Sequence, residues 1–510
     1  MARLKEVKRG GAMLVLDFDK QLVPGSFEHA LCHMVDQGLD LTGLLSRIRN
    51  DGAGAPAYDP AVLLKIVLLA YSRGIISSRK MAAACRDNVT FMVVSGESQP
   101  DHRTLAAFVS KLGGALAKLF AQVLVLCDAQ GLIGREMFAI DGVKLPSNAS
   151  KARSGTRADF QRPLYKMEKQ AQQMIQAHRQ ADAHSQAEDA RQARKLARLQ
   201  RDAEQLRQWL KDHPKDRMGT QGKPVMSNLT DNESAKMATD KGVIQGYSGV
   251  ATVDDKHQII MDAQAFGTGS ENALLAPVVD ATRALGTLDT VFTADAGYHS
   301  KTGLEHLHKH GVQAFIADNS YRQRDERYAE QDAHKAKGSA LHDKSQKNKA
   351  KADKPKLFGP DDFCWNQDTN ICICPAGKRL YGNGSNCTIK GRHAVKFTGA
   401  KQDCVPCKWR QQCLRKPETT QTRQVAFLLG TRPSDAPDVL ADMRQRIDSD
   451  EGKRMITRRF ATVEPVFGNL RYNKRLSRFT LRGKTKVDGQ FKLYAMMHNI
   501  EKFAGSGYAQ

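Results

Sequence analysis

Residues 137–150 read MFAIDGVKLPSNAS and carry the change of pattern on which the fold interpretation depends. The apolar run 137–140 predicts a buried strand, and it places Asp141 at or near the end of that strand, before Gly142. An Asp in this position is often only a turn residue. It is equally a candidate metal ligand, because the ends of central strands present side chains to a shared crevice.

A second stretch, 290–300, reads TVFTADAGYHS and repeats this arrangement with Asp295. Two such strands in one sheet would bring their carboxylates together. Strand-like runs at 250–252 and 259–261 and helical patterns at 271–285 and after Lys301 alternate around it. This alternation predicts an α/β fold, a mixed sheet flanked by helices.

A third carboxylate lies in residues 458–482, RRFATVEPVFGNLRYNKRLSRFTLR, where Glu464 is surrounded by basic side chains. A basic run is usually a solvated face. A carboxylate inside such a field is kept ionised, and the field attracts phosphates. Pro465 disfavours α conformation at Glu464 and predicts that a helix starts or kinks there. The final helix, 487–504, has apolar positions that would dock on the sheet.

Residues 1–135 read as an all-α N-terminal domain. Asp59 and Pro60 give one helix start, and 105–130 reads as one further helix. Short helices with nearby arginines suit a helix-turn-helix module that grips DNA. A plain bundle for packing or dimerisation fits the periodicity equally, and the overall charge favours DNA.

Two further segments separate these parts. Residues 161–213 show 3,4 spacing of apolar residues in two tracts, which predicts a coiled-coil-like helical hairpin or a dimer contact without chemistry. Residues 321–356 lose hydrophobic periodicity and read as a flexible basic linker.

Seven of the ten cysteines fall between Cys364 and Cys413, in an insert that we place at 357–420. A CxxC pair fits two corners of a tetrahedral zinc site, and an all-thiolate site is closed and structural. The predicted Zn²⁺ ligands have the spacing C-x29-C-x2-C-x5-C and are Cys374, Cys404, Cys407 and Cys413. Three other thiols could substitute for Cys374: Cys364, Cys372 and Cys387.

Lys plus Arg exceed Asp plus Glu by 78 − 55 = 23, and the pI is about 9.6. Such a surplus favours a nucleic-acid partner over an anionic membrane. The longest apolar stretch, 61–71, is interrupted by Lys65 and is too short to cross a bilayer. We therefore expect a cytoplasmic, nucleoid-associated protein with no membrane partner.

The order Asp141, Asp295, Glu464 resembles a DDE transposase of a bacterial insertion sequence. FAIDGVKLPSNAS is similar to the first-aspartate motif of that family, TADAGYHS to the second, and TVEPVFGNLRY with FKLYAMMHNIEK to the glutamate motif and closing helix. The N-terminal YDPAVLLKIVLLAYSRGIISSRK and PDHRTLAAF, and the insert's CPAGK and CVPCKWRQQC, also resemble these transposases. The resemblance spans nearly the whole chain.

The resemblance implies an RNase H-like catalytic domain in two parts, 136–320 and 421–510, in which Asp141, Asp295 and Glu464 hold two Mg²⁺ (or Mn²⁺) ions. It implies endonuclease cleavage of double-stranded DNA at terminal inverted repeats and strand transfer into target DNA, by a homodimer or larger complex. The sequence departs from the related YREK signature, with Thr457, Phe460 and Arg471 in the Tyr, Arg and Lys slots. The residues that we expect to contact DNA are Arg458, Arg459, Arg471, Lys474 and Arg475.

Two alternatives fit the same residues. A nuclease of this fold would cut without joining. A zinc-containing DNA-binding protein would use the helical domain and the insert and leave its carboxylates without catalytic use, which the intact triad disfavours.

Overall fold

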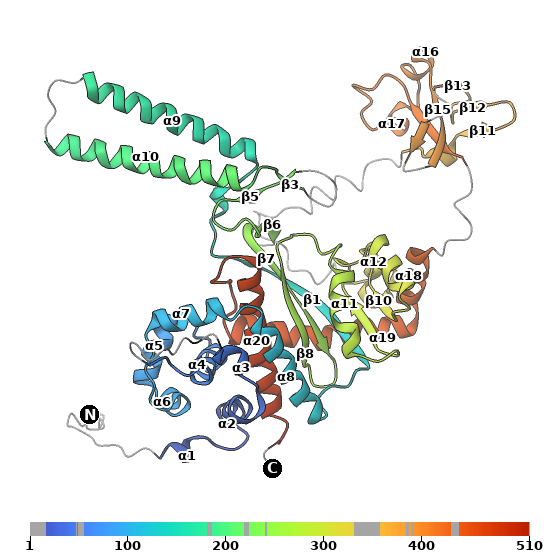
Figure 1. Cartoon of the computed structure of the whole chain (residues 1–510). Coiled ribbons are helices and arrows are strands. Elements are labelled where there is room, and N and C mark those ends of the chain that lie inside the picture. The colour runs from blue at the N-terminus through green and yellow to red at the C-terminus, as the bar shows by residue number, and fades with distance from the viewer. Residues whose placement is uncertain are drawn as a thin grey trace, which may run out of the picture. The chain divides into compact units, whose positions relative to one another are not determined.

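The computed structural model describes residues 17–46, 48, 56–180, 186–218, 224–239, 242–330, 357–383, 387–389, 392–429 and 438–508. The chain divides into two compact units (Figure 1). Unit 1 comprises Met1–Arg324 and Val439–Gln510, and unit 2 comprises Asp325–Asp438. The N-terminal helices and the candidate catalytic sheet thus share one unit and one hydrophobic core.

Unit 1 is built on a mixed sheet with the order β10-β9-β1-β7-β6, and β8 pairs with β7 as well. β9 runs parallel to β1 and β10, whereas β7 runs antiparallel to β1, β6 and β8. The sheet confirms the α/β expectation. The strand bounds are β1 Met137–Pro146, β6 Ala235–Thr239, β7 Gly242–Asp254, β8 Ile260–Phe266, β9 Val291–Ala294 and β10 Ala314–Ile316.

The first strand is longer than the sequence indicated. β1 continues to Pro146, so Asp141 lies within the strand rather than at its end. The reason is long-range pairing, because β7 is antiparallel to β1 from Phe138↔Asp254 to Pro146↔Gly246. Parallel pairing of β1 with β9 ends earlier, at Ala139↔Thr293. Asp141 therefore lies just beyond the point where β9 stops.

Helices from the middle and the C-terminal part of the chain cover the sheet (Figure 1). α20 packs along β8, where the Asn499 side chain donates to the Ile260 carbonyl at 2.9 Å and accepts from its N–H at 2.8 Å. It also holds the N-terminal helices, since Tyr71 and Tyr494 stack with centroids 4.4 Å apart. The covering helices are α11 Leu275–Thr282, α12 Lys301–Lys309, α18 Val439–Asp448, α19 Asp450–Gly468 and α20 Lys484–Ala504, with π-helix η7 Asn469–Asn473 after α19.

The N-terminal part is helical as expected. The Asp59 carboxylate caps α4 through the Ala61 N–H at 2.8 Å. The single helix expected over 105–130 is wrong: it breaks at Gly113-Gly114, and the two halves are bent by 82°. Gly113 has φ +44°, a left-handed conformation that glycine adopts without strain. The helices are α1 Phe18–Gln21, α2 Phe27–His33, η1 Met34–Gly38, α3 Thr42–Leu45, α4 Pro60–Ser72, α5 Ser78–Asp87, α6 Val89–Ser95, α7 His102–Lys111 and α8 Ala115–Ala129.

In the described part of the chain, no single helix is long and apolar enough to cross a membrane, although the bent pair α7 and α8 would pass on length and composition.

The insertion between β1 and β7 is a helical hairpin, α9 Arg157–Gln180 and α10 Gln186–Asp212 (Figure 1). Small strands lie at its base: β2 Ser154–Gly155, β3 Arg217–Met218, β4 Pro224–Val225 and β5 Ser227–Asn228. The segment expected to be a flexible linker, 321–356, begins with two short helical elements, α13 Tyr321–Arg324 and η4 Glu326–Tyr328. The rest of that expected linker, 331–356, lies outside the described residues.

Unit 2 contains a sheet of short strands in the order β11-β12-β13-β15-β14, with β16 on β15. Its core includes Phe363, Cys372 and Phe397. β16 pairs in this unit, so the chain returns to unit 1 only at Val439 rather than at 421. The elements are β11 Cys364–Asn366, β12 Ile371–Ile373, β13 Arg379–Gly382, β14 Cys387–Ile389, β15 Arg392–Thr398, β16 Gln424–Leu428, α16 Lys401–Cys404 and α17 Arg410–Cys413.

Candidate active site

The three carboxylates singled out in the sequence line one open pocket of unit 1, with about 800 Å³ of free space. Asp141 comes from β1, Asp295 directly follows β9, and Glu464 lies on α19. Their separation in sequence is large, so only the tertiary fold brings them to one place.

The register of the two parallel strands explains how Asp141 meets Asp295. Met137 lies opposite Val291, an offset of 291 − 137 = 154 positions. Continued past the end of β9, the same offset sets position 141 beside position 295. Since neighbouring strands are about 4.8 Å apart, the pairing that ends at Ala139↔Thr293 brings Asp141 and Asp295 to the same region, where both line the pocket.

Glu464 lies inside helix α19, which continues through Pro465, so the expectation that a helix starts there is wrong. A proline in a helix removes the hydrogen bond to the carbonyl four residues earlier, which here belongs to Ala461. The Gln258 side chain donates to that carbonyl at 3.2 Å. A long-range partner thus replaces the missing bond, and the helix carries Glu464, exposed, to the pocket.

Arg459 lies five residues before Glu464 on the same helix and is only 3% exposed. Its guanidinium contacts an Asp141 carboxylate oxygen at 3.2 Å and donates from Nε to the Ile140 carbonyl at 3.3 Å. Burial raises the pKa of Asp141, and the charges of Asp295 and Glu464 add to the rise, while Arg459 opposes it. The site therefore has a surplus of negative charge that one buried cation partly offsets.

A fourth carboxylate, Glu271, lies behind this group and was missed in the sequence. A Cβ at Gly297 would be 2.6 Å from Glu271 Oε2 and 3.1 Å from Asp295 Oδ1. A Cβ at Gly142 would be 2.8 Å from the Tyr298 hydroxyl and 3.5 Å from Glu271 Oε1. The glycine that closely follows each Asp was the available signal, because it leaves room for Glu271 and Tyr298.

Glu271 has a perturbed environment. Burial raises the pKa of its carboxyl, and Asp295 and Asp141 add to the rise, while Lys144 opposes it from 3.9 Å. The buried Tyr298 hydroxyl has no hydrogen-bond partner among the described residues. It therefore faces the carboxylates with an unused donor.

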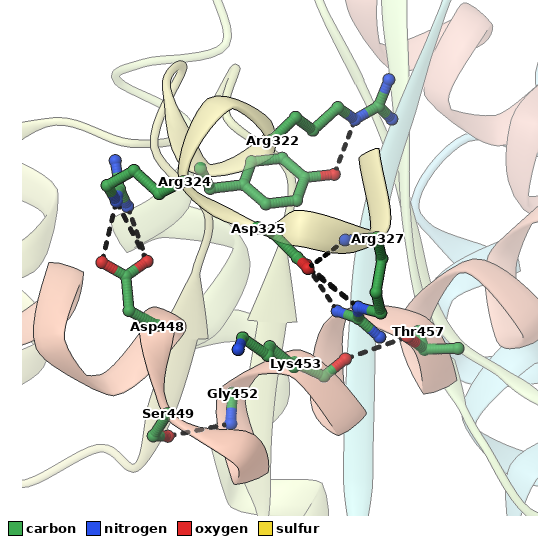
Figure 2. A network of polar contacts seen from close by, with 10 residues as sticks. Arg322, Arg324, Asp325, Arg327, Asp448, Ser449, Gly452, Lys453 and Thr457 are labelled. Carbon is green, nitrogen blue, oxygen red and sulfur yellow. Dashed lines mark hydrogen bonds and ion pairs between the residues drawn. The ribbon is translucent and has the colours of Figure 1, made fainter. Parts of the chain in front are cut away.

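The loop that forms the rim of the pocket is fixed by Arg324. Its guanidinium makes paired hydrogen bonds with Asp318 at 2.5 and 3.0 Å and also bonds Asp448 at 2.8 Å. Figure 2 shows the Arg324 guanidinium bonded to the carboxylate of Asp448, the last residue of α18. The same loop places Arg322 at the pocket, where the Tyr321 hydroxyl accepts from its Nε at 2.9 Å.

Comparison with known proteins adds two family matches. Residues 16–111 match a transposase domain of the DUF772 family, and residues 373–504 match a transposase DDE domain. Both matches are to transposase domains, and together they support a DDE transposase of an insertion sequence. The second match includes Glu464, whereas Asp141 and Asp295 lie outside both matches, so their assignment depends on the geometry above. No curated protein and no solved structure matched the transposase.

The expected DNA contacts of the transposase fall into two groups. Arg458 bonds Glu136 at 2.6 Å and also pairs with Asp255, and Arg459 is buried on Asp141. Lys474 donates to the Ser72 carbonyl at 3.0 Å and pairs with Glu501. The two remaining residues are exposed: Arg471 and Arg475.

None of the ten cysteines, all of which lie within the described residues, forms a disulfide. Four of them line one pocket of unit 2, and they are Cys374, Cys404, Cys407 and Cys413. Burial raises the pKa of Cys413, and Cys404, Cys407 and Cys374 add to the rise. The Cys374 sulfur also accepts from the Lys378 N–H at 3.4 Å.

The substitute ligands lie elsewhere in unit 2. Cys372 is in the core, Cys364 is exposed on β11, and the Cys387 thiol donates to the Ala394 carbonyl at 2.9 Å. Within the described residues of the transposase, no three His, Cys, Asp or Glu side chains are spaced to hold a metal ion as they stand.

Proposed function

We propose that this transposase cleaves DNA at the terminal inverted repeats of its insertion sequence and joins the ends to target DNA. The observation that supports this most is the meeting of Asp141, Asp295 and Glu464 in one pocket. A mixed sheet whose central strand and parallel neighbour each supply an Asp, with a Glu from a covering helix, supports an RNase H-like arrangement.

The three carboxylates would hold two Mg²⁺ ions, since a hard cation prefers carboxylate oxygens. Bound there, the metals would supply an activated water or 3′-hydroxyl and stabilise the leaving 3′-oxygen during in-line displacement. In the structure, Arg459 neutralises part of the negative charge of the carboxylates that the metal ions would neutralise. Exposed Arg471 and Arg475 would hold phosphates, and an assembly of two or more chains would bring both DNA ends together.

The test uses purified full-length protein, Mg²⁺ and a labelled duplex carrying a candidate inverted repeat from the DNA that flanks the coding region. Nicking followed by joined products supports the transposition chemistry. Nicks without joined products favour a nuclease of the same fold. Tight binding without either product favours a non-catalytic DNA-binding protein.

Glu271→Gln is expected to raise the Mg²⁺ concentration needed for half-maximal cleavage by about tenfold, the lower end for groups that support metal ligands. The substitution removes a negative charge close to Asp141 and Asp295 while keeping the side chain's size. A Mg²⁺ titration of the cleavage rate measures it. Glu305→Gln, which removes an exposed carboxylate of α12, is the control and should leave the titration unchanged.

The zinc prediction has its own test. We expect about one Zn²⁺ per chain from metal analysis, held by Cys374, Cys404, Cys407 and Cys413 as a structural site. Changing Cys404 and Cys407 together to Ser should remove it and destabilise unit 2, because structural zinc binding contributes to folding. Cys364→Ser, at an exposed thiol outside the pocket, should retain the metal. Metal-free wild-type protein would contradict the assignment.

A further inference from the structure

The hairpin of α9 and α10 has no part in the function proposed above. α10 has 27 residues, which gives a helix about 40 Å long. The two helices run antiparallel side by side (Figure 1). Their seam is apolar and includes Met167 of α9 and Leu206 of α10. We call the hairpin the arm.

Basic side chains gather on one face of the arm. At 100° per residue, five residues of α10 lie within an arc of about 120°. All five are exposed: Arg191, Arg194, Lys195, Arg198 and Arg201. On α9, exposed Lys166 is turned from the seam in the same sense, whereas exposed Arg162 and Lys169 point almost directly away from the seam. Because the helices are antiparallel, turns in the same sense place Lys166 on the same side as the five residues of α10, and we call this side the basic face.

The opposite face has a different charge pattern. Arg207 of α10 pairs across the seam with Glu168 at 2.7 Å and within its helix with Glu204. These three residues are turned from the seam in the opposite sense to the basic face. Cations there are neutralised by acids of the arm itself. Among the described side chains of the basic face, the ion pair found is Arg198 with Asp202, at a long 3.8 Å.

The arm is held firmly at its base. Arg157 donates to the Leu210 carbonyl at 2.8 Å and to the His213 carbonyl, and its N–H donates to Asp216 at 2.8 Å. The rings of Phe160 and Trp209 meet edge-on with centroids 4.7 Å apart. The arm follows β1 along the chain, with only short elements between them, and β1 carries Asp141. The basic face is therefore presented by a pre-organised element rooted in the candidate catalytic sheet.

We propose that the basic face binds the phosphate backbone of double-stranded DNA without reading its sequence. Lys and Arg side chains that neutralise phosphates release counterions and so provide affinity, and phosphate contacts position a protein without carrying base information. This inference rests on the proposed function for its DNA partner, and it assigns the arm the role of holding DNA beyond the reacting end.

The test measures binding of full-length protein to a labelled duplex that lacks any terminal repeat, over a range of salt concentrations. A four-residue variant, Arg191→Gln, Arg194→Gln, Lys195→Gln and Arg201→Gln, removes charge from the basic face at exposed positions. We expect at least tenfold weaker binding at low salt. The slope of log K against log salt should become less negative by up to about 3.6, at 0.9 for each lost phosphate contact.

A relocation variant is the matched control. It carries the same four changes together with Gln161→Lys, Gln172→Lys, Ala197→Lys and Gln200→Lys, at exposed positions turned toward the opposite face. Net charge is restored, but the basic face is not, so binding should stay weak. Recovered binding would show that only bulk charge matters and would overturn the proposal. An unchanged affinity and slope in the four-residue variant, or a changed oligomeric mass with unchanged affinity, would overturn it as well.

The same duplex separates this inference from the proposed chemistry. Asp141→Asn protein with an intact arm should bind it as wild type does. If no protein cleaves a repeat-bearing duplex while the arm variants still lose affinity, the chemistry fails and the basic face stands. If cleavage is normal and the arm variants bind normally, the proposed chemistry stands and the proposal for the basic face fails.

Discussion

Asp141→Asn and Glu464→Gln are each expected to lower cleavage of a repeat-bearing duplex by about a thousandfold, while DNA affinity stays within about twofold. Metal ions at such a site contribute several kcal/mol to the transition state, and about 4 kcal/mol corresponds to a thousandfold in rate. Each substitution removes one charged oxygen ligand and keeps the side chain's shape. Affinity is retained because it comes mainly from Lys and Arg contacts to phosphates.

Single-turnover cleavage measured with DNA in excess of its dissociation constant separates the two effects. Asp280→Asn, at a partly exposed carboxylate of α11 that contacts His306 and Arg283, serves as the control and should cleave as wild type does. Residual activity near the wild-type level in Asp141→Asn would remove Asp141 from the site. Loss of DNA binding in the same variant would instead indicate a structural role.

The three carboxylates that line the pocket could be singled out in the sequence because their signals are local. Apolar runs before Asp141 and Asp295 are short enough to read as strands. The length of β1 could not be read in the same way, since Asp141-Gly142 resembles a turn. Only pairing with β7, whose residues are about a hundred positions later, keeps the chain extended to Pro146.

The backbone at Glu464 was misread for a related reason. Local sterics at Pro465 disfavour a helix, and the compensation comes from Gln258, which is distant in sequence. Glu271 escaped notice because it lies in no recognisable motif and becomes relevant only when the sheet brings it behind Asp141. The CxxC spacing of Cys404 and Cys407 is likewise a local signal, and both thiols line one pocket with Cys374, while their binding of zinc stays a prediction.

Arg459 shows how a basic run can mislead. In the sequence it is one of several cations expected on DNA, whereas in the structure it is buried beside Asp141. Its neighbour Arg458 instead forms ion pairs with Glu136 and Asp255. Helical phase separates the two, because consecutive residues point about 100° apart. The partner of each follows from the fold rather than from the charge pattern.

Arg459→Gln is expected to destabilise unit 1 by about 3 kcal/mol in the absence of divalent metal, the lower end for removing one partner of a buried ion pair. The variant leaves Asp141 without its cation, in a pocket that also holds Asp295 and Glu464. Mutual repulsion of these carboxylates is then opposed only by solvent and by the N–H groups of Gly142 and Gly297 that donate to Asp141 and Asp295. Added Mg²⁺ would supply the missing positive charge, so the variant should regain more stability from Mg²⁺ than the wild type does.

Thermal unfolding of wild type and Arg459→Gln, each with and without Mg²⁺, measures how much stability each protein gains from Mg²⁺. Arg458→Gln is the matched control, because it removes the adjacent cation from acids outside the pocket and should respond to Mg²⁺ as wild type does. Equal Mg²⁺ stabilisation of all three proteins would contradict the view that Arg459 and the metals balance the same charge. A selective gain in Arg459→Gln would link the buried ion pair to metal binding by a measurement that needs no DNA and no turnover.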